Sequence, residues 1–187
     1  MKFLVLALAI VAALAEPEET VDLEWLNESL YGANQDAWKS LQADDGSVYY
    51  LAWSTYNDDE TWGTDITCLS VTGMNVNEEE KSIDAVISFK SNGEDAYQVS
   101  YEKVYAVTTE GYEKENAIMY VTEDGQTYTD VLVYSDGNSC DVFYVPPKDG
   151  YELWAKNPSE IAENCQSVFE KYTAGRNVLD VFKSDCQ

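Results

Sequence analysis

Histidine is absent from this chain of 187 residues, and arginine occurs only once, as Arg176. Without histidine, neither a Ser-His-Asp triad nor a Cys-His nucleophile can be built. Zinc and copper sites with histidine ligands are excluded for the same reason. The composition therefore argues against a secreted hydrolase that uses these groups.

Positive charge is scarce as well, with 11 basic against 35 acidic side chains and a formal net charge of −24. Nucleic acids and anionic membranes require a positive surface, so neither is an expected partner. The acidity favours cations as partners, such as metal ions, amines or basic proteins. Equally, it is compatible with a role in solubility alone.

Long apolar runs are missing beyond residue 15. Residues 1–15 have the three parts of a secretory signal peptide: Lys2, an apolar stretch at 3–12, and the small-residue cleavage site Ala13-Leu14-Ala15. Cleavage there predicts a secreted chain of residues 16–187. A chain of that length fits a single domain.

Cysteine occurs four times and never as C-x-x-C, so we expect two disulfides and neither a metal site nor a cofactor. The residue pattern alone allows all three pairings of Cys68, Cys140, Cys165 and Cys186. Asn27-Glu28-Ser29 is a sequon for N-linked glycosylation.

Short segments with a period of two dominate the rest of the chain, separated by Asp-Gly and Asn-Gly turn sequences. They predict eight strands and an up-and-down barrel or a sandwich. A short helix is expected at 34–42. A second helix is expected to begin at Asn157 as N-cap, with Pro158 in its first turn, and to end at Gly175. The predicted strands are 48–56, 65–71, 82–89, 97–107, 117–122, 127–134, 140–145 and 151–155.

Several predicted strands carry a carboxylate two residues from an aromatic ring, which places both on one face of the sheet. A carboxylate beside aromatic rings suits a small organic cation, through charge-assisted hydrogen bonds and cation–π contacts. With 35 acids and 24 aromatic residues, a solvated acidic wall gives the same pattern by chance. The groups concerned are Tyr128 with Asp130, Asp141 with Phe143, Glu152 with Trp154, and Tyr56 with Asp59 and Trp62.

Longer blocks resemble the histamine-binding proteins of tick saliva over nearly the whole of residues 16–187. The resemblance implies a lipocalin: an eight-stranded antiparallel barrel with a C-terminal helix on its wall and a short N-terminal helix. It also implies binding of histamine without catalysis, with serotonin as a second candidate ligand. The blocks are DAWKSL (36–41), TY (55–56), WG (62–63), TC (67–68), NVNEEEKSI (75–83), ENA (115–117), TEDGQ (122–126), TDV (129–131), CDV (140–142) and GYELW (150–154).

Carried over from the family, two internal amine pockets map onto this sequence. Asp59 and Glu102 are the expected polar anchors of the first, although Glu102 shares its strand face with Gln98 and Ser100, so ordinary core packing would turn it outward. The resemblance also implies the pairings Cys68–Cys186 and Cys140–Cys165. The first pocket comprises Tyr56, Asp59, Trp62, Glu102, Tyr120, Tyr128 and Asp130, and the second Ser40, Asp44, Asp141, Glu152 and Trp154.

Two other functions compete with histamine sequestration. One is a lipocalin that carries serotonin only, or a lipid mediator, although a lipid carboxylate needs a basic pocket. The other is a surface interaction protein that binds a basic partner. We expect a monomer in each case.

Overall fold

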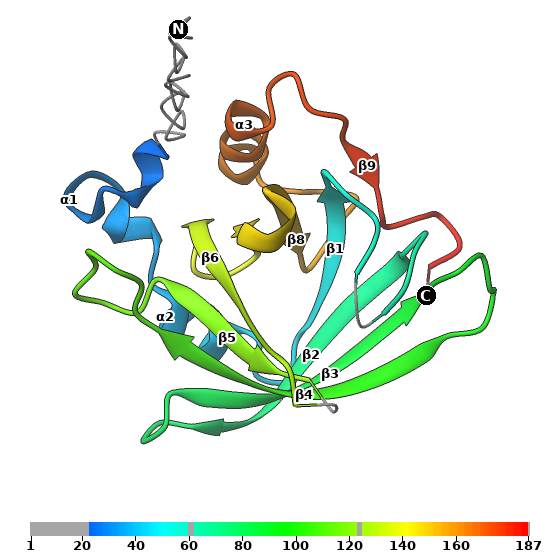
Figure 1. Ribbon diagram of the computed structural model, residues 1–187, viewed down its shortest axis with the longest axis horizontal. Coiled ribbons are helices and arrows are strands. Elements are labelled where there is room, and N and C mark those ends of the chain that lie inside the picture. Colours follow the sequence, from blue (N-terminus) through cyan, green and yellow to red (C-terminus); the bar gives the residue numbers. More distant parts are fainter. Residues whose placement is uncertain (1–22, 60–61, 123–124, 187) are drawn as a thin grey trace, which may run out of the picture.

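The computed structural model describes residues 23–59, 62–122 and 125–186 (Figure 1). Eight antiparallel strands pair in chain order, and β1 also pairs with β8, so the sheet closes into a barrel. The observed strands agree with the predicted ones to within two residues, except that β2 continues to Asn77. They are β1 (Val48–Ser54), β2 (Thr67–Asn77), β3 (Ser82–Lys90), β4 (Gln98–Val107), β5 (Ala117–Val121), β6 (Thr127–Ser135), β7 (Cys140–Val145) and β8 (Gly150–Ala155).

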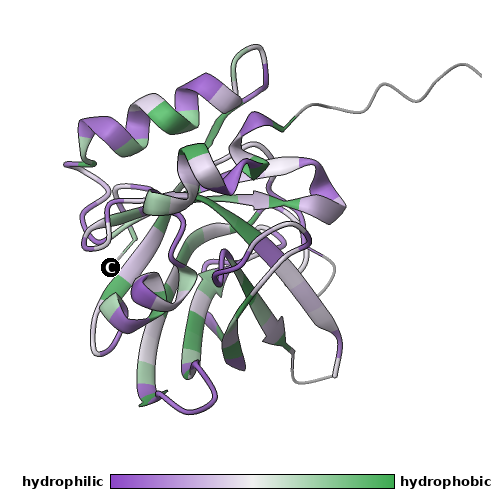
Figure 2. Ribbon diagram, turned by 90° about the vertical axis from the view of Figure 1, so that its left-hand side faces the viewer, coloured by the Kyte–Doolittle hydropathy of each residue, from purple (hydrophilic) through white to green (hydrophobic). Residues whose placement is uncertain are grey.

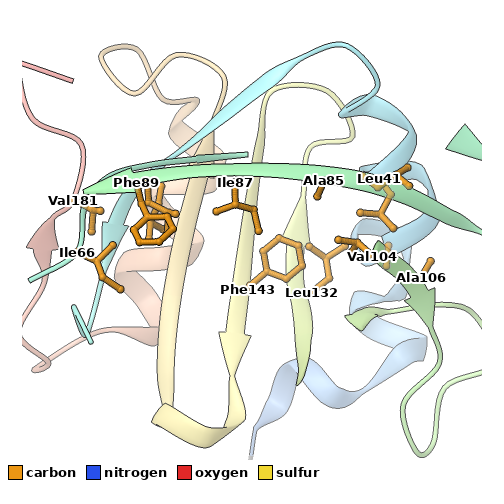
Figure 3. Close-up of a cluster of buried hydrophobic side chains, with 14 residues drawn as sticks. Leu41, Ile66, Ala85, Ile87, Phe89, Val104, Ala106, Leu132, Phe143 and Val181 are labelled. Carbon is orange, nitrogen blue, oxygen red and sulfur yellow. The ribbon is translucent and has the colours of Figure 1, made fainter. Parts of the chain in front are cut away.

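Side chains from every second residue of the strands fill the barrel interior, as the sequence pattern predicts. Ala85, Ile87 and Phe89 point from β3 into the barrel, toward Leu132 and Phe143 on the opposite wall (Figure 3). This arrangement follows from the period of two, which sends every second side chain to the same face. The interior therefore has an apolar wall against which a small ligand can pack.

Helices and 3₁₀ turns are short and lie at the edges of the barrel. The longest helices are α2 (Ala37–Ala43) and α3 (Glu163–Tyr172), and the Asp36 carboxylate caps α2 by accepting the N–H of Lys39 at 2.9 Å. A ninth strand, which the sequence pattern did not predict, adds to the end of β1. The remaining elements are η1 (Glu24–Leu26), α1 (Glu28–Tyr31), η2 (Gly32–Asn34), η3 (Pro146–Lys148) and β9 (Leu179–Asp180).

The predicted start of the last helix is wrong, because α3 begins at Glu163 with Ala162 as its N-cap. Asn157 does not cap α3. Its side-chain oxygen accepts the N–H of Ser159 at 3.2 Å and its carbonyl accepts the N–H of Glu160 at 3.0 Å. Asn157 thus closes a separate turn, in line with the tendency of asparagine to bond its own neighbourhood.

The outer wall of the barrel forms a second apolar cluster, in which Phe169 of α3 packs with Val142 and Leu153 of β7 and β8. Hydrophilic and hydrophobic residues alternate along the helices and strands in Figure 2, as expected for elements with one buried face. α3 therefore covers the outside of the barrel and leaves the interior to the strands and α2.

Both disulfides that the resemblance implies are present. Cys68–Cys186 joins β2 to the C-terminal segment, and Cys140–Cys165 joins β7 to α3. Residues 1–15 lie outside the described residues, and none of the helices within the described part has the length and apolar character needed to cross a bilayer.

Candidate amine-binding site

One cavity of about 120 Å³ lies inside the barrel. All of the polar and aromatic residues that the family resemblance assigned to two pockets line it. The structure thus brings both predicted groups to one internal space. They are Ser40, Asp44, Tyr56, Asp59, Trp62, Glu102, Tyr120, Tyr128, Asp130, Asp141, Glu152 and Trp154.

The segment between β1 and β2 supplies three of these residues. Asp59 and Gly63 exchange two backbone hydrogen bonds of 2.7 and 2.9 Å, and the Asp59 carboxylate accepts the backbone N–H of Trp62 at 3.0 Å. The Trp62 ring then lies 5.5 Å from that of Phe89, between centroids, while its Nε1 is buried without a hydrogen-bond partner. This tight turn presents an acid and an indole N–H to the same cavity.

β4 turns Glu102 into the barrel on the same face as Val104 and Ala106, and it turns Val99 and Tyr101 toward solvent. Glu102 is 5% exposed, whereas Val99 and Tyr101 on the opposite face are 52% and 62% exposed. The Ser100 hydroxyl donates to Glu102 at 3.4 Å. The face of β4 that carries Val104 and Ala106 points inward, and it buries Glu102 as well, although a carboxylate is costly to bury. A buried carboxylate on the cavity wall suits a cationic ligand.

Asp130 lies on β6, beside the stacked rings of Tyr120 and Tyr128, whose centroids are 5.6 Å apart. Its side chain is 7% exposed, and its Oδ1 has no hydrogen-bond partner. Burial raises the pKa of Asp130 well above its ordinary value, the Glu152 carboxylate raises it further, and a hydrogen bond from Tyr120 opposes the shift.

Glu152 connects the two predicted groups. One of its oxygens accepts the Tyr56 hydroxyl at 2.5 Å, and the other accepts Nε1 of Trp154 at 2.8 Å. Burial raises the pKa of Glu152, the two hydrogen bonds lower it, and Asp59 raises it. The Tyr56 ring fits here because residue 150 is glycine: a Cβ on Gly150 would lie 2.5 Å from the ring.

Asp44 and Asp141 form the acidic group at the end of the barrel near α2. The Ser40 hydroxyl donates to Asp141 at 2.8 Å. Burial raises the pKa of Asp141 to about 6, and it raises the pKa of Asp44 well above its ordinary value, with a further contribution from Asp141. Asp44 Oδ1 is buried and has no partner. Gly73 of β2 permits this close packing, since a Cβ there would lie 3.0 Å from that of Asp44.

Three residues with polar groups, Tyr49, Asn57 and Lys148, also line the cavity and were not predicted as site residues. Tyr49 is buried on β1, on the same inward face as Leu51. The alternation of residues along the strand could have revealed this position. Lys148 pairs with Asp58 at 2.7 Å, and its Nζ lies 5.9 Å from the centre of the Tyr56 ring. Asn57 also lines the cavity. The latter two lie in connecting segments, where no periodic pattern assigns a side to a residue.

The described residues offer little to a metal ion. Their one compact group of three ligand-type side chains contains Cys68, Cys186 and Asp185, and the two cysteines are bonded to each other. The cavity acids are better suited to an organic cation, because aromatic rings lie among them.

Comparison with known proteins shows the family of this chain. The family profile described as "Tick histamine binding protein" matches residues 25–187. This chain belongs to the tick histamine binding protein family. The female-specific histamine-binding protein 1 of Rhipicephalus appendiculatus is 43% identical over 187 residues, which cover 98% of this chain and 97% of that protein. The male-specific histamine-binding salivary protein of the same organism is 39% identical over 157 residues, covering 80% and 77%.

Solved structures support the lipocalin fold of this family member. The crystal structure of the AM182 serotonin complex matches with a TM-score of 0.59 and 22% identity, over 81% of this chain and 92% of that one. Apocrustacyanin C2 matches with a TM-score of 0.56 and 11% identity, over 78% and 81%. The similarity confirms the predicted fold, a lipocalin-type eight-stranded barrel with a helix on its wall.

Proposed function

We propose that this protein binds and sequesters histamine inside its barrel, and that it binds serotonin as a second amine. One observation carries the proposal. Three buried side-chain atoms of the described residues lack hydrogen-bond partners, and all three line the cavity: Asp44 Oδ1, Trp62 Nε1 and Asp130 Oδ1. Unpaired buried polar atoms are costly and rare, so their convergence on one cavity indicates that a polar ligand completes them.

The buried acids determine which charge the ligand should carry. The carboxyl groups of Asp44, Asp130, Asp141 and Glu152 are all buried, and burial raises the pKa of each. A cation beside them favours their ionised form and offsets the cost of burial. Histamine carries an ammonium group, which donates, and an imidazole ring with one donor and one acceptor nitrogen. It can therefore donate to the Asp44 or Asp130 oxygen and accept from Trp62 Nε1.

The aromatic residues bind the flat part of the ligand. Trp62, Tyr120 and Tyr128 present half-buried rings to the cavity, and such rings attract cations over their faces. No bond is formed or broken in this process. The protein acts by mass action, because it lowers the free concentration of the amine that is available to receptors.

The relatives are named for histamine binding, at 43% and 39% identity. A lipid mediator with a carboxylate fits this cavity less well, because at least six acids line it and its lysine, Lys148, is already paired with Asp58. We further propose that residues 1–15 are removed on secretion, that Asn27, which is exposed, carries a glycan, and that the protein is a monomer.

Isothermal titration calorimetry with histamine, serotonin and a leukotriene, in parallel, tests the function. We expect both amines to bind and the leukotriene to give no heat. Tight binding of the leukotriene alone would make the protein a lipid carrier. An absence of binding for all three would favour a surface interaction protein instead.

A further inference from the structure

β4 is longer than its neighbour β5, so one edge of β4 is open over part of its length. β3 pairs with β4 from Gln98 to Tyr105, whereas β5 pairs only with Lys103–Val107. In Figure 1 the β3–β4 hairpin continues past the end of β5. Within the described part of the chain, residues 98–102 of β4 therefore have a partner strand on one side only.

The open edge presents the backbone groups of Val99 and Tyr101. The Ala106 N–H donates to the Lys81 carbonyl at 2.9 Å, toward β3, and the register of β4 with β3 is unbroken. Because backbone groups alternate between the two sides of a strand, the other even-numbered residues of this register also point toward β3. The N–H and C=O groups of Val99 and Tyr101 point the other way, where the described residues supply no strand.

The side chains along this edge are apolar and lie in solvent. Val99 is 52% exposed and Tyr101 is 62% exposed, and Tyr101 has Val86 as its neighbour on β3. Proteins usually protect an open edge with lysine, proline or a bulge. Residues 98–102 contain neither lysine nor proline, and their register with β3 has no bulge. An added strand would thus find four backbone groups and two apolar side chains already in position.

Charge determines which kind of strand can bind here. Glu94 and Asp95 are exposed just before β4, and neither forms an ion pair with another described residue. The nearby Lys90 and Lys103 are each paired with an acid. A second copy of this chain, with its formal net charge of −24, would be repelled. A basic segment would be attracted.

We propose that residues 98–102 of β4 bind an extended basic segment of a partner protein, which adds to the barrel as a further strand. Its backbone bonds Val99 and Tyr101, and its apolar side chains pack against theirs. In complexes of this kind the main-chain hydrogen bonds supply affinity and the alternate side chains supply specificity. The inference goes beyond amine sequestration and does not use the cavity.

Fluorescence anisotropy of the full chain with a labelled octapeptide of alternating valine and lysine tests this proposal. We expect saturable one-to-one binding. Changing both Val99 and Tyr101 to threonine should weaken it about tenfold, because two cross-strand contacts are lost. Met74→Thr, which alters an exposed apolar residue of β2 away from this edge, is the matched control and should change nothing.

Two modified peptides separate strand pairing from adsorption. An octapeptide N-methylated at the amides of alternate residues keeps its charge and cannot donate to the edge, so it should bind about tenfold more weakly or worse. A valine–glutamate peptide should not bind. Equal binding of the N-methylated peptide, or no binding of the valine–lysine peptide, overturns the proposal.

Sedimentation velocity of the protein alone completes the test. Self-association that the double threonine variant abolishes would make a second copy the occupant and overturn the proposal of a basic partner. A monomer at every concentration supports it. Histamine calorimetry on the same samples reports on the cavity separately, so failure of the peptide to bind leaves the amine function standing.

Discussion

Replacing Asp130 by asparagine should stabilise the ligand-free protein and weaken its binding of histamine. Asp130 is buried, one of its oxygens has no partner, and its pKa is raised by burial and by the Glu152 carboxylate. Its ionised form is therefore unfavourable in the empty barrel. Asparagine keeps the shape of the side chain and removes the charge that a bound amine would neutralise.

The two effects of Asp130→Asn differ in size as well as in sign. Loss of one partner of a buried charge pair costs about 2–5 kcal/mol, which corresponds to an affinity loss of roughly 30-fold or more. Each unit by which burial raises a carboxyl pKa costs about 1.4 kcal/mol of stability at a pH above both values. Allowing for the unsatisfied amide left behind, a net gain of about 1 kcal/mol should raise the Tm by about 2–4 °C.

Asp136→Asn is the matched control. Burial alone would raise the pKa of Asp136, but hydrogen bonds from Ser139 and from the N–H groups of Asn138 and Cys140 lower it overall. This acid stabilises a turn, so its replacement should lower the Tm and leave histamine affinity nearly unchanged. Thermal unfolding by circular dichroism and calorimetry on the same samples decides the matter. A lowered Tm with unchanged affinity in Asp130→Asn would show that Asp130 is structural.

Three other predictions can be checked with similar samples. Histamine affinity should fall as the pH drops through about 6, the raised pKa of Asp141. The stability of the ligand-free protein should decrease as the pH rises from about 4 to about 6, because folded Asp141 holds its proton more tightly than unfolded Asp141 does. Asp141→Asn should remove this pH dependence from urea titrations across that range. Trp62→Phe keeps the ring beside Phe89 but loses the unpartnered Nε1, so calorimetry should show an affinity loss of roughly 3- to 10-fold with an unchanged Tm. Changing both Cys140 and Cys165 to serine should lower the free energy of unfolding in urea by about 3 kcal/mol, and an unchanged midpoint would contradict this.

The strands were predictable because their information is local. Ile83, Ala85, Ile87 and Phe89 recur at every second position of β3 and are buried. Asn92-Gly93 supplies the two positive φ angles of a tight turn within the connection from β3 to β4. The start of α3 and the two residues of β9 were not predictable in this way. The start of α3 depends on which backbone groups the Asn157 side chain bonds. Strand β9 exists because two residues pair with β1, and two residues are too few to show a repeating pattern in the sequence.

The site depended on a different kind of information. Residues 98–101 predict that Glu102 turns outward, since Val99 and Tyr101 would ordinarily take the buried face, whereas Val104 and Ala106 share the face of Glu102 and point inward. The family resemblance is what placed Glu102 in the amine pocket. Likewise, the bonds of Glu152 to both Tyr56 and Trp154 join two groups that the sequence kept apart, because they lie in one cavity only after the barrel has closed.

A crystal structure of the histamine complex would show where the amine binds. We expect histamine inside the barrel, with an amine nitrogen within hydrogen-bonding distance of Asp130 Oδ1 or Asp44 Oδ1, and with its ring beside Trp62 or the Tyr120–Tyr128 pair. Histamine found on the outer surface, with these atoms still unpartnered inside the barrel, would contradict this expectation.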